Sequence, residues 1–311
     1  MSPGRPSLNH DRRAELLALA GELRPDLHRY CARFMGSVID GEDVVQDTLV
    51  RAFVVLQDLD EAPALRPWLF RIAHNRALDL LRSREVRMAE PIDAASDVAA
   101  SAQPDPLEML MRKEAVKTAV SRLVELPSLQ RSVVILKDVL DESLIEIAAL
   151  LDLTVDAVKG HLARDRAHLR EINALDRPLP DARPASAAAA RYVALFNKRD
   201  RDGLRELLAD DVKLHQSLHP LRTGRADVGL FFTLYAKIDG VSLSPAWLED
   251  REVVAVFEDR ADPKPNYIMW LEWRDGRISF IHDYRYVRYV AADAELTLAA
   301  EANPANDGAA Q

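Results

Sequence analysis

The sequence predicts a multidomain chain with an all-α N-terminal part, arranged as two helical blocks, and a smaller α+β domain after it. Apolar residues recur at helical spacing from Asp11 to Arg87 and again from Leu107 to about Leu175. After residue 187, apolar and polar residues alternate in several short runs, which is typical of strands that bury one face. A length of 311 residues exceeds what one hydrophobic core usually holds, so several domains are expected.

The first block is predicted to contain three helices, near residues 12–36, 40–57 and 65–87. The stretch that follows it is rich in Ala, Ser, Asp and Pro and poor in large aliphatic residues, which is typical of a linker. A second linker contains prolines that prevent a continuous helix. The predicted segments are 1–90, 91–106, 107–175, 176–186 and 187–292, with a flexible acidic tail over 293–311.

The last domain is predicted to be α+β. One or two helices over 187–208 precede four strand-like runs that are rich in Val, Ile, Tyr and Trp. Asp275-Gly276 separates the last two runs and indicates a hairpin, because both residues tolerate a positive φ. The four runs cover residues 241–247, 252–258, 267–273 and 278–290.

Composition excludes several classes of protein. The single cysteine, Cys31, cannot form a disulfide within the chain or a cysteine-based zinc site, and its apolar setting favours a buried position. Residues 1–13 are polar and lack the apolar stretch of a signal peptide. No run approaches the roughly 18 apolar residues that a membrane helix needs. We therefore expect a cytoplasmic protein without a membrane partner, a metal or a cofactor.

The net charge of -9 is unevenly distributed along the chain. Residues 88–108 carry acidic side chains and no Lys or Arg, and the tail after residue 292 is also acidic. The three predicted domains are close to neutral, so the acidic whole-chain charge does not exclude nucleic-acid binding. The local distribution of arginine is the informative quantity.

A helix-turn-helix pattern marks the second block. Leu144–Leu151 is a short amphipathic helix, Asp152-Leu153-Thr154 interrupts it, and Val155–Arg170 restarts the helical spacing. If the apolar residues of the second helix face inward, its outer face and first turn are suited to a DNA major groove. The pattern alone fits a helical hairpin with solvated charges equally well. The candidate DNA-binding residues are Thr154, Asp156, Ala157, Lys159, His161 and Arg164.

Two segments of the first block resemble the extracytoplasmic function (ECF) sigma factor family. Asp40–Phe53 is similar to the helix by which sigma region two binds the polymerase clamp, and Arg66–Arg84 is similar to the promoter-melting helix. The helix-turn-helix resembles region four, which reads the upstream promoter element. The resemblance implies polymerase contacts by Asp43, Gln46, Asp47, Arg51 and Phe53, and promoter contacts by Arg66, Trp68, Arg71, Asn75, Arg76, Arg82 and Arg84.

The residues of the melting segment suit this role physically. Six arginines lie between Arg66 and Arg87, interleaved with aromatic residues, and such a stripe can hold the phosphates and unstacked bases of a single strand. Trp68 also fits a buried core position, and Asn75 and Asp79 could bind a flipped base or brace the fold.

The turn and second helix of the region-four resemblance depart from the family's pattern. Asp152 replaces the glycine usual in the turn, although Asp accepts left-handed backbone better than most residues. Gly160, which is expected on the outer face of the second helix, stands where the family more often has a serine. Asp165 is expected to weaken the attraction of this helix for phosphate.

Residues 187–292 resemble, at the level of pattern, the SnoaL-like and ketosteroid-isomerase-like cone fold. The candidate ligand-pocket residues are His215, Tyr267, Trp270, Asp283 and Tyr284, because polar and aromatic groups on a concave sheet suit ligand contact. Alternation places His282 on the face opposite Asp283, so the two cannot both line the cone. We expect no catalysis.

The sequence therefore predicts a sigma factor that binds core RNA polymerase and promoter DNA, under the control of its C-terminal domain. A small-molecule ligand of that domain is a further candidate partner. Two alternatives stay open: a SnoaL-like or ketosteroid-isomerase-like enzyme fused to a DNA-binding module, and a simple helix-turn-helix repressor. The repressor leaves the two sigma-like segments of the first block unexplained.

Overall fold

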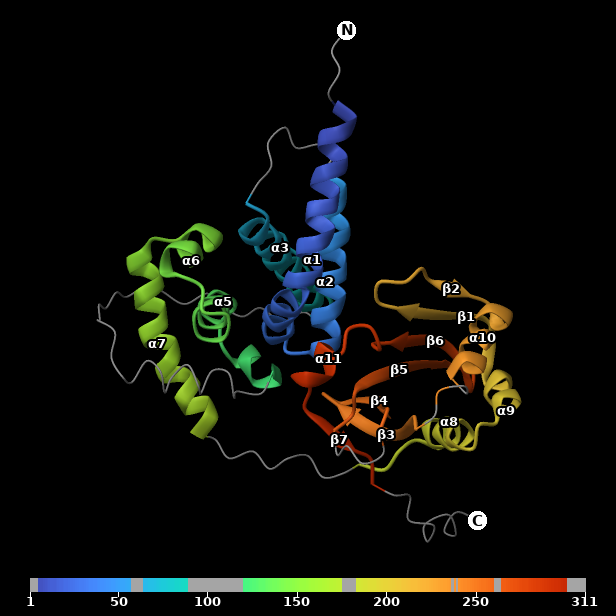
Figure 1. The fold of residues 1–311 in the computed structure, drawn as a ribbon. Coiled ribbons are helices and arrows are strands. Elements are labelled where there is room, and N and C mark those ends of the chain that lie inside the picture. Colours follow the sequence, from blue (N-terminus) through green and yellow to red (C-terminus); the bar gives the residue numbers. More distant parts are fainter. Residues whose placement is uncertain are drawn as a thin grey trace. The chain divides into compact units, whose positions relative to one another are not determined.

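The computed structural model describes residues 5–56, 64–88, 120–174, 183–235, 238, 240–259 and 264–300. The chain divides into two compact units, Met1–Asp176 and Arg177–Gln311 (Figure 1). Each unit has a hydrophobic core of its own. Among the described residues the first unit is helical and the second combines helices with a mixed sheet, so the predicted fold class is confirmed. The predicted linker over 91–106 lies outside the described residues.

The first helical block contains α1 (Arg5–Met35), α2 (Val38–Val55) and α3 (Leu65–Met88). The Ser37 side chain caps α2 by accepting a hydrogen bond from the Asp40 backbone N–H at 3.2 Å. Gly41 allows α1 and α2 to approach closely, because a Cβ at this position would stand 2.5 Å from the Ala32 backbone. The three predicted helices are therefore present, with ends within a few residues of those expected except at the start of α1.

The second helical block contains η1 (Val120–Glu125), α5 (Ser128–Val134), η2 (Ile135–Val139, a π-helix), α6 (Leu144–Leu151) and α7 (Val155–Ala174). Ser143 and Glu146 form a reciprocal capping box at the start of α6. Asp152 ends that helix in the left-handed conformation, with φ 58°. The Thr154 hydroxyl accepts the Ala157 N–H at 3.1 Å and so caps α7. The predicted helix-turn-helix and its cap are confirmed.

A buried ion pair holds α7 against the preceding helices. The Arg166 guanidinium donates to both carboxylate oxygens of Asp138, at 2.9 and 2.5 Å, and the Asp138 side chain is only 1% exposed. Losing one partner of such a pair leaves a buried charge uncompensated and typically costs about 3–5 kcal/mol. The pair therefore fixes the position of the helix that the sequence assigns to DNA reading.

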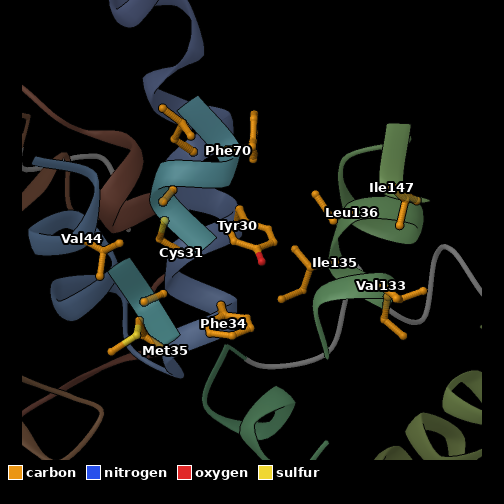
Figure 2. Close-up of a cluster of buried hydrophobic side chains, with 14 of the residues drawn as sticks. Tyr30, Cys31, Phe34, Met35, Val44, Phe70, Val133, Ile135, Leu136 and Ile147 are labelled. Atoms are coloured by element: carbon orange, nitrogen blue, oxygen red, sulfur yellow. The ribbon is translucent and has the colours of Figure 1, made fainter. Parts of the chain in front are cut away.

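The two helical blocks share one hydrophobic core. Tyr30, Phe34 and Phe70 of the first block belong to the same buried cluster as Ile135 and Leu136 of the second (Figure 2). Within this unit the blocks are thus in direct contact, although the sequence separates them by a long segment of linker composition. Nothing in the spacing of apolar residues predicts this junction.

The second unit is a seven-stranded sheet in the order β2-β1-β6-β5-β4-β3-β7. β1 and β6 are parallel and the other neighbouring pairs are antiparallel. Asp275 and Gly276 both have positive φ (53° and 72°) and form the predicted hairpin turn. The elements are α8 (Ala187–Asn197), α9 (Arg201–Glu206), β1 (Leu208–Gln216), β2 (Arg222–Thr223), α10 (Arg225–Tyr235), β3 (Ser242–Leu248), β4 (Arg251–Phe257), β5 (Tyr267–Arg274), β6 (Arg277–Asp283), α11 (Tyr289–Ala292) and β7 (Leu296–Leu298).

Two sequence predictions in this unit are wrong. The run predicted as a strand over 278–290 is a strand only to Asp283, and its apolar residues Val287 and Val290 are buried in a turn and in α11. Within the tail predicted to be flexible over 293–311, Leu296–Leu298 form β7, which pairs with β3, and residues 301–311 lie outside the described residues. Short terminal strands depend on a partner edge, which local periodicity does not show. Among the described residues no helix is long and apolar enough to cross a membrane.

Candidate nucleic-acid interface

Four of the predicted contact residues meet at one pocket between α2 and α3. The pocket has a volume of about 390 Å³, within the range of about 300–1,000 Å³ typical of small-ligand sites. Its lining residues are Arg51, Val55, Trp68, Ile72, Asn75 and Arg76. Trp68, Asn75 and Arg76 come from the predicted promoter-contact set, whereas Arg51 comes from the predicted polymerase-contact set. An aromatic ring, an amide and two guanidinium groups thus surround an apolar floor.

Carboxylates of α2 hold two of the predicted promoter-contact arginines. Arg76 binds Asp47 through Nε at 2.7 Å, and Arg84 binds Asp40 at 2.8 Å. Arg82, by contrast, is exposed to solvent. The predicted melting segment therefore carries two arginines that are paired with carboxylates and one arginine that is exposed to solvent.

The remaining two arginines of this set contact the second helical block. Arg66 donates to the Glu142 carboxylate at 2.6 and 3.1 Å and to Asp26 at 3.2 Å. Arg71 donates to the Ala149 carbonyl oxygen at 2.6 Å. In this arrangement carboxylates engage the Arg66 guanidinium through Nε and both terminal nitrogens, whereas the exposed Arg71 uses one terminal nitrogen and keeps its other donors.

Buried polar contacts complete the junction between the blocks, and sequence reasoning missed them. The Tyr30 hydroxyl lies 2.8 Å from His74 Nδ1 and donates to Ser132 Oγ at 3.2 Å. Arg131 is buried and donates to three carbonyl oxygens, of Phe34 in α1 and of Val124 and Leu126. A buried arginine that donates to three carbonyl oxygens acts as a positional clamp, because its planar fork requires all three acceptors to stay in place.

We expect acid to weaken this junction through His74. Burial, with a smaller effect of the Arg82 charge, lowers the pKa of His74 from 6.5 to about 4. The folded state therefore binds fewer protons than the unfolded state between these values, and stability is lost as pH falls below 6.5. From pH 7 to pH 5 the free energy of unfolding should fall by about 2 kcal/mol.

Denaturant unfolding at pH 5, 6 and 7 tests this expectation. A His74→Gln variant keeps a polar side chain but has no proton to gain, so its stability should lack this component of the pH dependence. The decisive quantity is the difference in unfolding free energy between the two proteins. A difference that stays constant over this pH range would contradict the role of His74.

The predicted polymerase-binding residues line the accessible side of α2. Asp43 and Arg51 are exposed, and Gln46, Asp47 and Phe53 are half-buried. Val50 and Val54 on the same helix are 60% and 56% exposed, and the sequence prediction omitted both. Exposed valines one turn apart are an unusual surface feature and could have been found from the apolar pattern of α2.

The predicted DNA-binding residues of the helix-turn-helix differ in their exposure to solvent. Asp156 is exposed and binds Lys159 at 3.4 Å, and Arg164 contacts His161 Nδ1 at 3.4 Å. Gly160 was expected on the outer face but is buried. Thr154 is exposed and Ala157 is half-buried.

Asp165 does not lie on the side of α7 that the sequence predicts to face DNA. It is 1% exposed, and neither carboxylate oxygen has a hydrogen-bond partner among the described residues. Burial raises the pKa of Asp165 to about 7, against a smaller opposing effect of the Arg164 charge. The expectation that this carboxylate repels phosphate at the surface is therefore wrong, because the side chain continues the buried stripe of Val158, Leu162 and Leu169.

The predicted ligand-pocket residues lie on different faces of the sheet. Tyr267 belongs to the helix-covered core, whereas Trp270 stacks on His282 on the other face with ring centroids 4.6 Å apart. His215 pairs in register with His282 and shares that second face. Tyr284 follows the end of β6 and is buried. The set therefore does not form one pocket, and His282 and Asp283 face opposite sides as alternation requires.

Asp283 lies in a buried polar cluster in the core of the second unit. Gln216 Nε2 donates to its Oδ2 at 2.6 Å, Tyr235 donates at 3.4 Å, and the hydroxyls of Tyr235 and Tyr267 are 2.5 Å apart. Burial raises the pKa of Asp283 to about 6, while the Gln216 hydrogen bond opposes this. Because every neighbour donates to it, the carboxylate is satisfied as an anion, which is typical of a structural group.

Three family models match the chain: Sigma-70 region 2 over residues 19–87, Sigma-70 region 4 over 115–169, and a SnoaL-like domain over 189–281. The chain is 30% identical to the ECF sigma factor SigW of Bacillus subtilis over 153 residues, which cover 47% of this chain and 81% of SigW. It is 38% identical to the sigma factor CnrH of Cupriavidus metallidurans over 137 residues, which cover 42% of this chain and 71% of CnrH. The chain belongs to the ECF RNA polymerase sigma factors.

A longer match links this sigma factor to SigG of Mycobacterium tuberculosis, with 33% identity over 225 residues. That match covers 63% of this chain and 60% of SigG, so the sigma factor spans less than two thirds of that relative's length. The pocket between α2 and α3 lies wholly within the region 2 match, and the helix-turn-helix lies within the region 4 match apart from the end of α7. Asp283 and Tyr284 lie beyond the SnoaL-like match.

Proposed function

We propose that this sigma factor binds core RNA polymerase and directs it to start transcription at specific promoters. The pocket between α2 and α3 supports the proposal most directly, because Trp68, Asn75, Arg76 and Arg51 surround it. Stacking on an aromatic face, hydrogen bonds to a base edge and cations for phosphate are what an unpaired nucleotide requires. Holding such a nucleotide favours the melted promoter over the duplex.

Each group at the pocket has a proposed part in this reaction. The half-buried Trp68 ring offers one face for stacking, and the exposed Asn75 amide can both donate to and accept from a base edge. The exposed arginines, with Arg82 among them, contact phosphate and fix the strand without reading its sequence. On α2, the exposed Val50 and Val54 add apolar area to the predicted polymerase-binding face.

Region four is proposed to bind duplex promoter DNA through the start of α7. The Thr154 cap leaves the remaining N–H groups of the first turn available, and the positive end of the helix dipole favours phosphate there. Lys159, His161 and Arg164 are half-buried, and we propose that they contact the DNA from the next turns. This contact requires no change in the helix-turn-helix itself.

DNA binding by region two does require a change in the first unit. Arg66 and Arg71 are engaged by Glu142 and by the Ala149 carbonyl of the second block. While the blocks stay in contact, Glu142 occupies two nitrogens of the Arg66 guanidinium, so phosphate would have to displace it. We propose that the blocks separate when the sigma factor binds polymerase and promoter DNA.

The SnoaL-like domain is proposed to regulate the sigma regions by contact and not by catalysis. Its candidate acid-base groups do not converge, since His215 and His282 lie on the face opposite Tyr267. Asp283 is 1% exposed and accepts hydrogen bonds from Gln216 and from the Arg285 backbone N–H. A small-molecule ligand of this domain, and a role of the acidic linker in polymerase, stay predictions.

We expect Asn75→Ala to reduce open-complex formation about tenfold while initial promoter binding stays within about twofold, because the amide should contact only an extruded base. The full chain with core polymerase and promoter DNA is the system, and a fluorescent base analogue in the melted strand reports opening. Asp79→Ala, one helical turn away and also exposed, tests the second candidate base contact of the same face. If the wild-type chain forms no stable complex with core polymerase, the proposed function is wrong.

A further inference from the structure

An ion pair connects the predicted polymerase-binding helix to the predicted melting helix. Arg76 on α3 reaches Asp47 on α2 with two nitrogens, Nε at 2.7 Å and a terminal nitrogen at 2.6 Å, and both bind the same oxygen, Oδ2. The Arg76 side chain is 24% exposed and the Asp47 side chain 47% exposed. An ion pair this accessible to solvent adds little to the free energy of unfolding, so the contribution that we consider is the orientation of the Arg76 side chain.

The pair fixes how Arg76 faces the pocket that it lines. A guanidinium group has five N–H donors in a rigid plane, and side-on binding to Asp47 uses two of them. Three donors remain for another acceptor, in a plane set by the carboxylate. Arg51, one helical turn after Asp47, lines the same pocket and has no ion-pair partner among the described residues. One cation at the pocket is therefore oriented and the other is not.

We propose that Asp47 is a positioning residue of the single-strand pocket, which orients Arg76 for the phosphate or base of the melted strand, and not a polymerase contact. The inference rests on the proposed function and changes the role that the family resemblance implies for this residue. Asp47 acts through Arg76 and does not touch nucleic acid itself.

Removing the charge of Asp47 has opposite expected effects on the open complex, depending on whether Asp47 acts through its charge or by positioning Arg76. Asp47→Asn removes a negative charge next to the DNA site, so attraction of the strand by charge alone would become stronger. If orientation of Arg76 is what matters, the same change leaves the guanidinium free to adopt other rotamers and weakens the open complex. A loss of open complex with no loss of initial binding is therefore specific to positioning.

The experiment uses the full chain with core polymerase and a promoter that carries a fluorescent base analogue. Four variants are compared with wild type: Asp47→Asn, Arg76→Ala, the double variant, and Asp43→Asn as a matched control on the exposed face of α2. Affinity for core polymerase is measured without DNA, and open-complex formation is measured separately. Thermal unfolding of each variant shows whether the fold is intact.

We expect Asp47→Asn to lower open-complex formation about fivefold, the loss an accessible ion pair can account for, with core affinity within about twofold of wild type. The double variant should be no worse than Arg76→Ala, because Asp47 has no role without its partner. Asp47→Glu, which keeps the charge, should recover part of the loss. Asp43→Asn should lower core affinity and leave the opening step of preformed complexes unchanged.

Two results would overturn the proposal. A loss of core affinity in Asp47→Asn that accounts for the whole loss of open complex, and adds to that of Arg76→Ala, would make Asp47 a polymerase contact. No effect of Asp47→Asn on either measurement would leave a surface ion pair without a positioning role. If Arg76→Ala and Asn75→Ala also left opening unchanged, the proposed pocket itself would be wrong, which is a separate outcome.

Discussion

Oxidation of a Gly36→Cys/Val124→Cys variant is expected to weaken promoter binding by the sigma factor about a hundredfold or more. A Cβ at Gly36 would stand 3.5 Å from the Val124 Cβ, within the spacing of about 3.5–4.5 Å that disulfides require. The cross-link would hold the second helical block against the end of α1. Arg66 and Arg71 would then stay bound to Glu142 and to the Ala149 carbonyl, and only the open fraction of the protein can bind DNA.

The reduced form of the same variant is the internal control. Gly36 has φ 72°, a conformation that costs a cysteine about 1–2 kcal/mol, so both forms carry the same backbone strain. The native Cys31 is buried and therefore a poor competitor for the new thiols. Promoter affinity is measured with core polymerase before and after reduction. Equal affinity of a fully cross-linked and a reduced sample would show that the closed arrangement is compatible with DNA.

Removal of residues 177–311 is expected to raise transcription about fivefold or more, at the low end of typical regulatory coupling, without changing promoter choice. The predicted DNA-contact and polymerase-contact residues all lie in the first unit, so promoter choice should survive. A domain tethered by a short Pro-rich linker has a high effective concentration, so even a weak interface can shift the arrangement of the sigma regions.

The truncated protein should remain folded, because no described residue of the second unit belongs to the core cluster of the first. An unchanged unfolding transition of the first unit therefore has to accompany the transcription result. Runoff transcription on several promoters measures both rate and choice. Identical rates with and without the second unit would contradict contact regulation and favour an enzymatic role for the SnoaL-like domain.

Local features of this protein were predictable from its sequence because their causes lie within a few residues. Thr154 caps α7 and Asp152 adopts the left-handed conformation, and both effects involve only neighbouring backbone groups. The Asp275-Gly276 turn likewise depends on two φ angles. The division into helical blocks and an α+β domain followed from the period of apolar residues, which reports the face that each element buries.

Sequence spacing did not predict the partner of each face, because contacts between distant elements leave no local periodicity. Gly160 and Asp165 were misplaced since a period of 3.6 defines a buried stripe but not its width. The strand predicted to continue to Val290 ends at Asp283, because a turn and α11 bury the same apolar residues in another way.

The sequence by itself determined the two sigma-like segments, the helix-turn-helix and the order of the domains, since each is a short pattern with a local physical cause. Only the tertiary structure decided what the charged side chains of those segments bind. It brought Asp47 to Arg76, joined Arg66 and Arg71 to the second block, and buried Tyr30 against Ser132, which is 102 positions away. Charged groups take partners from whatever element packs beside them, so their roles follow from packing and not from pattern.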